Sequence, residues 1–157
     1  MAVGGRVFLD TSILLGGLIE LGEASLAADR IIAAVARRAL GRPLTAWHCC
    51  LEFYSVATRL PAGLRLSPDS ACRLVEEEVL GRFTVCDLPA DGRVTFPAAS
   101  ARERVAGGRI YDAHIGEVAR LAGATVVVTD NLRHFTALTR HGIGVSSGAE
   151  FVAAHKL

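Results

Sequence analysis

Short β-rich runs alternate with longer amphipathic segments along the chain. The β-rich runs fall at 6–9, 44–46, 82–88 and 125–128, and the segments with helical periodicity fall at 23–40, 48–60, 67–80, 95–106 and 109–122. A last short helix is expected after residue 147. This alternation is typical of a parallel sheet with helices packed against it. We therefore expect an α/β fold that occupies one domain over residues 1–157.

Two of these helices begin with standard start signals. Ser67, Pro68 and Asp69 supply an N-cap hydroxyl, a proline at the first helical position and an acid in the first turn. Ser147 and Glu150 have the spacing of a capping box. These residues predict where both helices begin.

Two acidic residues directly follow predicted strands. Asp10 comes after the apolar run 7–9, and Asp130 comes after the β-branched run 125–129. Because the carboxyl ends of parallel strands form the ligand crevice of an α/β sheet, both acids are expected at its rim. Each residue could instead serve only as the N-cap of a following helix, and the pattern leaves this alternative open.

Two further acids lie inside predicted helices. Glu52 is part of an apolar stretch, and Asp112 lies in the first turn of the helix at 109–122, where the helix dipole stabilises a carboxylate. Either residue could be an ordinary solvated acid. Carboxylates that share a crevice repel one another unless a cation neutralises them, and hard oxygen ligands suit Mg²⁺ or Mn²⁺. The four acids together therefore suggest metal-assisted hydrolysis of a phosphodiester.

Composition narrows the choice of function. The chain has 17 Lys and Arg against 16 Asp and Glu, a net charge of +1, which excludes the strongly basic footprint of a protein that coats nucleic acid. The four cysteines form no C-x-x-C pair, so zinc-site spacing is missing, and we expect them to be small apolar residues of the interior. No apolar stretch approaches the roughly 20 residues of a membrane span. We expect a soluble, cytoplasmic protein.

The segments that carry the four acids are similar to those of a known family. They read FLDTSILL at 8–15, LE at 51–52, GRIYDAHI at 108–115 and VVTDNLRHF at 127–135. Together they resemble the PIN-domain family, and within it the VapC-like ribonuclease toxins of bacterial toxin–antitoxin pairs. The resemblance extends over nearly the whole chain. The motifs around Asp10 and Asp112 are specific in their context, whereas the match at Glu52 is short.

This resemblance implies a three-layer α/β/α sandwich with a mainly parallel central sheet. It also implies a metal-dependent endoribonuclease that is the toxin of a type II toxin–antitoxin pair. One or two Mg²⁺ or Mn²⁺ ions would be held by the acids Asp10, Glu52, Asp112 and Asp130. Supporting groups would come from Thr11 or Ser12, which would orient Asp10, from Thr129 near the fourth acid, and from Asn131. The partners would be RNA, a cognate antitoxin and a second copy of the chain in a homodimer.

The chain departs from the family pattern at the fourth acid. Many members have the acid or an asparagine two residues after the threonine, where this chain has Asn131. Many toxins also have an acid just before the final aromatic residue, where this chain has His134 before Phe135. We assign the fourth position to Asp130, with Asn131 as its helper.

Arginines near these segments are candidates for binding RNA phosphates: Arg109, Arg133 and Arg140. Each of them could equally be an ordinary solvated side chain.

Two other functions remain open beside the toxin. One is a PIN nuclease that processes RNA or cuts structured DNA, and the other is a catalytically silent PIN-fold module that binds RNA or a protein partner.

Overall fold

The fold is built on a central parallel sheet, which confirms the expected α/β class. The computed structural model describes residues 5–157, and the single-domain prediction also includes residues 1–4, which lie outside the described residues. Within the described residues, five strands lie in the order β3-β2-β1-β4-β5, and each neighbouring pair is parallel. Their bounds are Val7–Leu9 (β1), Leu44–Ala46 (β2), Thr84–Cys86 (β3), Val126–Val128 (β4) and Gly144–Ser146 (β5).

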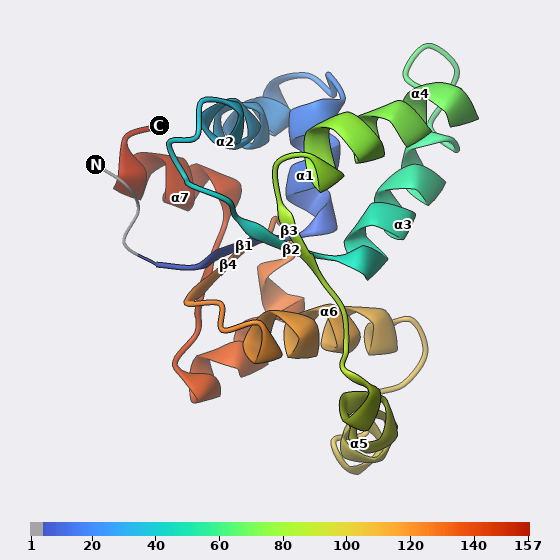
Figure 1. The fold of residues 1–157 in the computed structure, drawn as a ribbon, viewed down its shortest axis with the longest axis vertical. Helices are drawn as coiled ribbons and strands as arrows, with labels where there is room; N and C mark the ends of the chain where they lie inside the picture. Colours follow the sequence, from blue (N-terminus) through green and yellow to red (C-terminus); the bar gives the residue numbers. More distant parts are fainter. Residues whose placement is uncertain (1–4) are drawn as a thin grey trace.

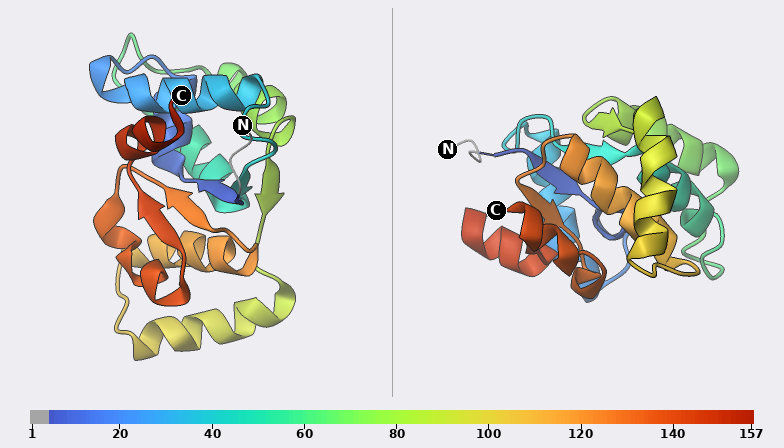
Figure 2. Two further views of the ribbon diagram at one scale, coloured as in Figure 1. Left: turned by 90° about the vertical axis from the view of Figure 1, so that its left-hand side faces the viewer. Right: turned by 90° about the horizontal axis from the view of Figure 1, so that it is seen from below.

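Helices cover both faces of this sheet, so the arrangement is the expected α/β/α sandwich (Figure 1). One layer contains α1 (Thr11–Leu18), η1 (Glu23–Ser25), α2 (Leu26–Ala36), α3 (Trp47–Ala57), α4 (Pro68–Leu74) with its π-helical continuation η2 (Val75–Leu80), and α7 (Gly148–His155). The other layer contains α6 (Arg109–Leu121), η3 (Leu132–His134) and η4 (Thr136–His141). Helix α5 (Ala90–Arg102) lies outside α6, farther from the sheet (Figure 2).

The core forms between the sheet and the two helix layers because the inner strands are apolar on both faces. Phe8 and Leu9 of β1 and Val127 and Val128 of β4 are fully buried. Burial of both faces is typical of parallel strands. The chain leaves this core at the carboxyl ends of β1 and β4, and the polar residues that follow lie at one edge of the sheet.

Both predicted helix starts are confirmed. The Ser67 hydroxyl accepts a hydrogen bond from the backbone N–H of Ser70, and Pro68 is the first residue of α4. Ser147 and Glu150 form a complete capping box at α7. The longest described helices, α5 and α6, have 13 residues each, and no helix within residues 5–157 is long and apolar enough to cross a membrane.

Some elements differ from the sequence prediction. Helix α1 and strand β5 were not expected, because α1 is apolar on nearly every side and β5 has Val145 as its one large apolar residue. Helix α5 spans Ala90–Arg102 rather than 95–106, and Pro97 lies inside it rather than near its start. Only Ser100 of α5 is buried, so this helix has no amphipathic pattern that marks its ends. Cys49 and Cys50 are buried as expected, but the expectation is wrong for Cys72, which is exposed.

Candidate active site

The site begins where strands β1 and β4 end side by side. Leu9 pairs with Val128 in the parallel register, and the backbone N–H of Asp10 donates to the carbonyl of Val128. Asp10 and Thr129 therefore follow neighbouring strands at the same edge of the sheet. Asp10 is the N-cap residue of α1, but its carboxylate makes no capping hydrogen bond. The carboxylate of Asp10 is therefore free to interact with other groups at this edge of the sheet.

The Asp10 carboxylate is buried and held by two hydroxyls. Only 6% of the residue is exposed. Its Oδ2 accepts hydrogen bonds from Thr129 Oγ1 at 2.8 Å and from Ser12 Oγ at 3.2 Å. Burial, with a smaller contribution from the negative charge of Glu52, raises the pKa of Asp10 to about 6 against the lowering effect of the Thr129 hydrogen bond. A carboxylate in this environment favours a nearby cation.

Glu52 lies on α3 and faces this carboxylate across Thr11. The Thr11 hydroxyl donates to Glu52 Oε2 over 3.0 Å, and His48 Nε2, one helical turn before Glu52, lies 3.9 Å from the same oxygen. The two hydroxyls after Asp10 therefore have different partners, because Ser12 contacts Asp10 and Thr11 contacts Glu52. Glu52 is thus engaged with α1 rather than free at the helix surface.

Asp112 comes from the first turn of α6 and is held by a histidine. His134 Nδ1 lies 2.6 Å from Asp112 Oδ2, and the Asn131 side-chain amide lies 2.7 Å from the same ring nitrogen. Because an ionised carboxylate only accepts hydrogen bonds, Nδ1 carries the proton and donates it to Asp112, so the neighbouring Asn131 side chain cannot donate to the same nitrogen. Both side chains are about a quarter exposed, at 24% for His134 and 26% for Asp112.

The structure does not bring the Asp130 carboxylate into contact with the other three acids. Asp130 Oδ1 accepts from the backbone N–H of Gly148 at the start of α7, over 3.4 Å, and the Asp130 backbone N–H donates to Ser12 Oγ. The next residue, Asn131, turns instead toward His134. Asp130 and Asn131 therefore face different helices, and the contacts favour Asn131 as the neighbour of Asp112. Thr129, expected near the fourth acid, contacts Asp10.

The donor chemistry of the site fits a hard divalent cation, although the ligands are not already gathered around one point. Asp10, Glu52 and Asp112 offer carboxylate oxygens, which Mg²⁺ and Mn²⁺ prefer. A cation beside Asp10 would offset both its burial and its repulsion by Glu52. Within residues 5–157, no three Asp, Glu, His or Cys side chains are close enough together to hold a metal ion. The carboxylate oxygens of the site are therefore of the type that Mg²⁺ or Mn²⁺ binds, while the Asp112 carboxylate is hydrogen-bonded to His134.

A row of aromatic side chains links α3 to α6 beside these acids. His48 stacks on Tyr111 with ring centroids 5.3 Å apart, and the ring of His114 meets His48 edge-on at 5.4 Å. Tyr111 precedes Asp112 and is 57% exposed. In the sequence, the only sign of this arrangement is the helical spacing of His48 and Glu52. His48 and His134 contact acids of the site, but the sequence patterns gave neither of them a role there.

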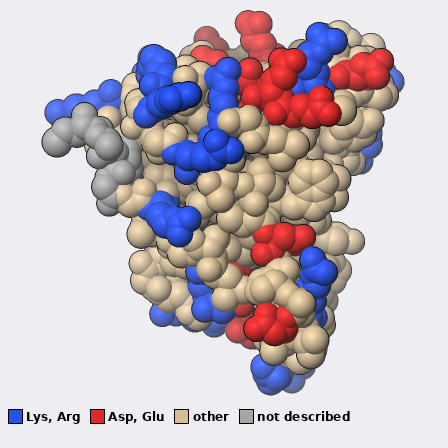
Figure 3. All heavy atoms as spheres, in the orientation of Figure 1, with Lys and Arg blue, Asp and Glu red and all other residues tan. Residues whose placement is uncertain are grey.

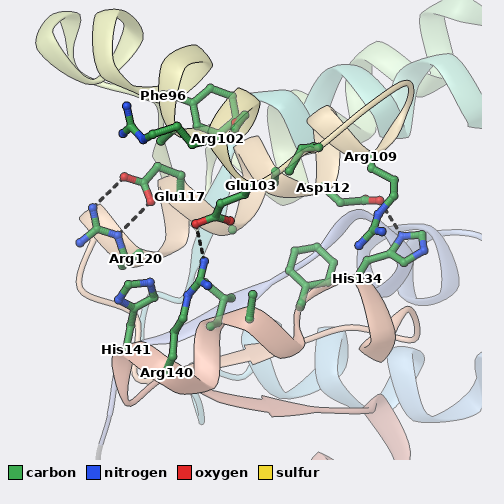
Figure 4. A pocket seen from close by; sticks show the side chains of 18 of the residues that line it. Phe96, Arg102, Glu103, Arg109, Asp112, Glu117, Arg120, His134, Arg140 and His141 are labelled. Carbon is green, nitrogen blue, oxygen red and sulfur yellow. Dashed lines mark hydrogen bonds and ion pairs between the residues drawn. The ribbon is translucent and has the colours of Figure 1, made fainter.

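The predicted arginines lie in two different environments. Arg109 and Arg140 line a cavity of about 540 Å³ between α5, α6 and η4, which we call the α5–α6 cavity (Figure 4). Asp112 and His134 form part of its wall. Arg133 is exposed and does not line it. On the face drawn in Figure 3, acidic and basic side chains lie close together over α5 and α6, in keeping with a net charge near zero.

Comparison with known proteins gives the same family as the sequence motifs. The model of the family described as PIN domain matches residues 6–133. Ribonuclease VapC40 of Mycobacterium tuberculosis is 31% identical over 121 residues, which cover 77% of this chain and 84% of that protein. Ribonuclease VapC27 of the same organism is 38% identical over 85 residues, which cover 53% of this chain and 58% of that protein.

Solved structures share the fold at low sequence identity. PAE2754 from Pyrobaculum aerophilum superposes with a TM-score of 0.61 at 21% identity, covering 99% of this chain and 98% of that one. VapBC-1 from nontypeable Haemophilus influenzae gives 0.61 at 17% identity, covering 92% and 98%. The family match, the 31% identity to VapC40 and the motifs around Asp10 and Asp112 agree. This chain belongs to the PIN-domain family.

Proposed function

We propose that this protein is a metal-dependent endoribonuclease and the toxin of a type II toxin–antitoxin pair. The observation that carries the proposal is the buried Asp10 carboxylate, which lies beside Glu52 at the carboxyl edge of the sheet. Burying a charge beside a like charge is unfavourable unless a cation compensates it. The names of the relatives, Ribonuclease VapC40 and Ribonuclease VapC27, support RNA as the substrate.

Each side chain of the site has a defined task in this proposal. Thr129 and Ser12 fix the orientation of the Asp10 carboxylate, and Thr11 does the same for Glu52. When bound, Mg²⁺ or Mn²⁺ supplies an activated water for attack on phosphorus and stabilises the leaving oxygen. One or two such ions would be held by Asp10, Glu52 and Asp112, with Asp130 or Asn131 at the fourth position.

His134 and Asn131 are positioning residues for Asp112. The short contact between His134 Nδ1 and Asp112 Oδ2 restrains the carboxylate at one end of the α5–α6 cavity. An acid at position 134 would repel Asp112, whereas the histidine donates a hydrogen bond to it. Arg109, which also lines the cavity, is the nearest candidate to contact an RNA phosphate on this side.

The proposed partners follow from the relatives. The related structures include VapBC-1 and FitAcB from Neisseria gonorrhoeae, the latter with a TM-score of 0.60 at 16% identity. We propose a cognate antitoxin as the protein partner of this chain, a homodimer as its assembly and the cytoplasm as its location. Size-exclusion chromatography with light scattering, alone and after co-expression with the neighbouring reading frame, tests both assemblies.

The nuclease is tested by cleavage of an end-labelled RNA in Mg²⁺, in Mn²⁺ or in EDTA. We expect wild-type protein to cut the RNA only with a metal, and Asp10→Asn and Asp112→Asn to lose this activity. Asp69→Asn, an exposed acid of α4, is the matched control. Cleavage by Asp10→Asn at the wild-type rate would contradict the mechanism. RNA binding without cleavage under any condition would favour the silent module.

The fourth position is tested by comparing Asp130→Asn with Asn131→Ala. The contacts of Asn131 with the His134 ring and of Asp130 with Gly148 predict the larger loss for Asn131→Ala. A larger loss for Asp130→Asn would show that Asp130 turns toward the other acids when RNA and metal are bound. A cognate antitoxin gene next to this one distinguishes the toxin from a processing nuclease.

A further inference from the structure

The α5–α6 cavity extends away from the candidate active site. In Figure 4, Arg109, Asp112 and His134 lie at one end, and Glu117 and Arg120 lie at the other. Its volume of about 540 Å³ is in the range of sites that hold small organic ligands. The cavity therefore begins at a proposed catalytic carboxylate and continues far enough to hold a second chemical group.

The wall of the cavity carries more positive than negative charge. It includes five arginines and three acids. Each acid already has a partner, because Glu117 pairs with Arg120, Glu103 pairs with Arg140, and Asp112 pairs with His134. Within residues 5–157, no ion pair or side-chain hydrogen bond engages the three remaining arginines, Arg102, Arg104 and Arg109. The unpaired cations favour an anionic ligand.

Apolar side chains line the same cavity between the arginines. Phe96 and Ala99 contribute from α5, and Phe135 and Leu138 contribute from the η3–η4 side. The Phe96 ring is restrained because it meets the ring of His114 edge-on at 5.7 Å. A ligand with one flat apolar part and one anionic part matches this wall. Unstacked bases of single-stranded RNA are bound in this manner by aromatic side chains and arginines.

Arg104 occupies a backbone conformation that ordinarily belongs to glycine. Its φ is +56°, its N–H donates to the carbonyl of Ala101, and the N–H of Val105 donates to the carbonyl of Ser100. This is the Schellman arrangement at the end of a helix, where glycine is preferred. Gly123 fills the equivalent position after α6. An arginine here is conformationally unfavourable, and it places a cation on the cavity wall.

We propose that the α5–α6 cavity receives one unstacked nucleotide of the RNA, next to the phosphodiester that the proposed site at Asp10, Glu52 and Asp112 would cleave. The base lies on the apolar wall that includes Phe96, and Arg102 and Arg104 contact the phosphate. This proposal rests on the proposed function, because the shared wall at Asp112 connects the cavity to the reacting phosphate. An acidic protein segment would use the arginines but leave the apolar wall without a flat group to cover it.

Arg38 offers a matched control for Arg104. Its φ is +60°, and it ends α2 in the same hydrogen-bond pattern. It lines a different hollow beside Arg42, which precedes β2, at the opposite edge of the sheet from the carboxyl ends of the strands. Arg104→Gly and Arg38→Gly therefore remove the same charge and relieve the same backbone conformation. Only the first changes the cavity.

The binding test uses a fluorescein-labelled 12-nucleotide single-stranded RNA of mixed sequence in EDTA, so that no cleavage takes place. Fluorescence anisotropy is expected to show a Kd at least about fivefold higher for Arg104→Gly and unchanged for Arg38→Gly. The slope of log Kd against log salt should fall by about 0.7 for Arg104→Gly, as for one lost contact to a single strand. Equal effects of the two variants would overturn the proposal.

The role of the base is tested by filling the cavity. Ala99 lines it, whereas the adjacent Ala98 on α5 is exposed and does not. Ala99→Trp is expected to weaken RNA binding as Arg104→Gly does, and Ala98→Trp should bind like wild type, with thermal unfolding as the check on folding. Wild-type binding by Ala99→Trp would overturn the proposal.

By NMR titration, uridine and adenosine monophosphates should bind more tightly than ribose 5-phosphate, and equal affinity would refute a base on the apolar wall.

A glutamate 12-mer peptide in the same anisotropy assay separates the two classes of macromolecule. Tighter binding of this peptide than of RNA, lost in Arg104→Gly, would assign the cavity to an acidic protein segment and overturn the nucleotide proposal. The nuclease is judged separately. If RNA binding depends on the cavity but no metal-dependent cleavage is found, the nucleotide proposal is supported and the nuclease is contradicted. If Arg104→Gly and Ala99→Trp cleave RNA at the wild-type rate at low RNA concentration, the nuclease is supported and the nucleotide proposal is contradicted.

Discussion

Replacing Asp10 by asparagine is expected to stabilise the metal-free protein at neutral pH while abolishing cleavage. Burial raises the pKa of Asp10 from 3.8 to about 6, so the ionised carboxylate destabilises the folded state by about 3 kcal/mol, at about 1.4 kcal/mol for each pKa unit. Asparagine removes the charge and keeps one oxygen that accepts from Thr129. Because the new amide must find an acceptor among the hydroxyls, we expect a net gain of about 1 to 3 kcal/mol.

The sign of the pH dependence follows from the same pKa. The folded-state pKa lies above the unfolded value, so wild-type protein binds a proton as the pH falls through about 6, and the penalty disappears below about pH 4. The advantage of asparagine is therefore complete above about pH 7 and absent near about pH 4. Added Mg²⁺ or Mn²⁺ should reduce the difference, because the metal stabilises the wild-type folded state by binding to it.

Urea unfolding followed by far-ultraviolet circular dichroism measures this difference, in EDTA at about pH 7.5 and at about pH 4.5. Asp29→Asn, on the exposed face of α2, controls for the loss of one negative charge. Two results would refute the reasoning. One is an Asp10→Asn protein that is no more stable than wild type at neutral pH, and the other is a gain that stays constant as the pH falls.

Three further substitutions test the contacts around the site. Thr129→Val removes the shortest side-chain hydrogen bond to the Asp10 carboxylate, so the pKa of Asp10 should rise. The acidic limb of the pH–rate profile for cleavage should then move to higher pH. An unchanged profile would show that the Thr129 hydroxyl does not act on Asp10. His134→Ala should lower cleavage about 10-fold or more at saturating metal, with His134→Gln restoring part of it through a hydrogen bond to Asp112. Ser147→Ala should lower the free energy of unfolding by about 1 kcal/mol through loss of the capping box, measured by urea unfolding, with the metal-dependent cleavage rate unchanged.

The sequence by itself determined the fold class and the position of Asp10. The alternation of short apolar strands with amphipathic helices specifies a parallel sheet, because the period of the apolar residues depends on the local backbone geometry. Asp10 at a strand end then had to lie at the carboxyl edge of the sheet. Asp112 in the first turn of α6 was also visible in the sequence, as were the caps of α4 and α7.

Only the tertiary structure decided which side chains meet. The contacts of His134 with Asp112 and of Asp130 with Gly148 join residues 22 and 18 positions apart, and no local pattern records them. The bounds of α5 and the α5–α6 cavity also depend on packing between segments, since α5 buries little and leaves no periodic signal. Local propensity fixes where a chain turns, whereas the direction of a side chain after a turn depends on neighbours that are distant in the sequence.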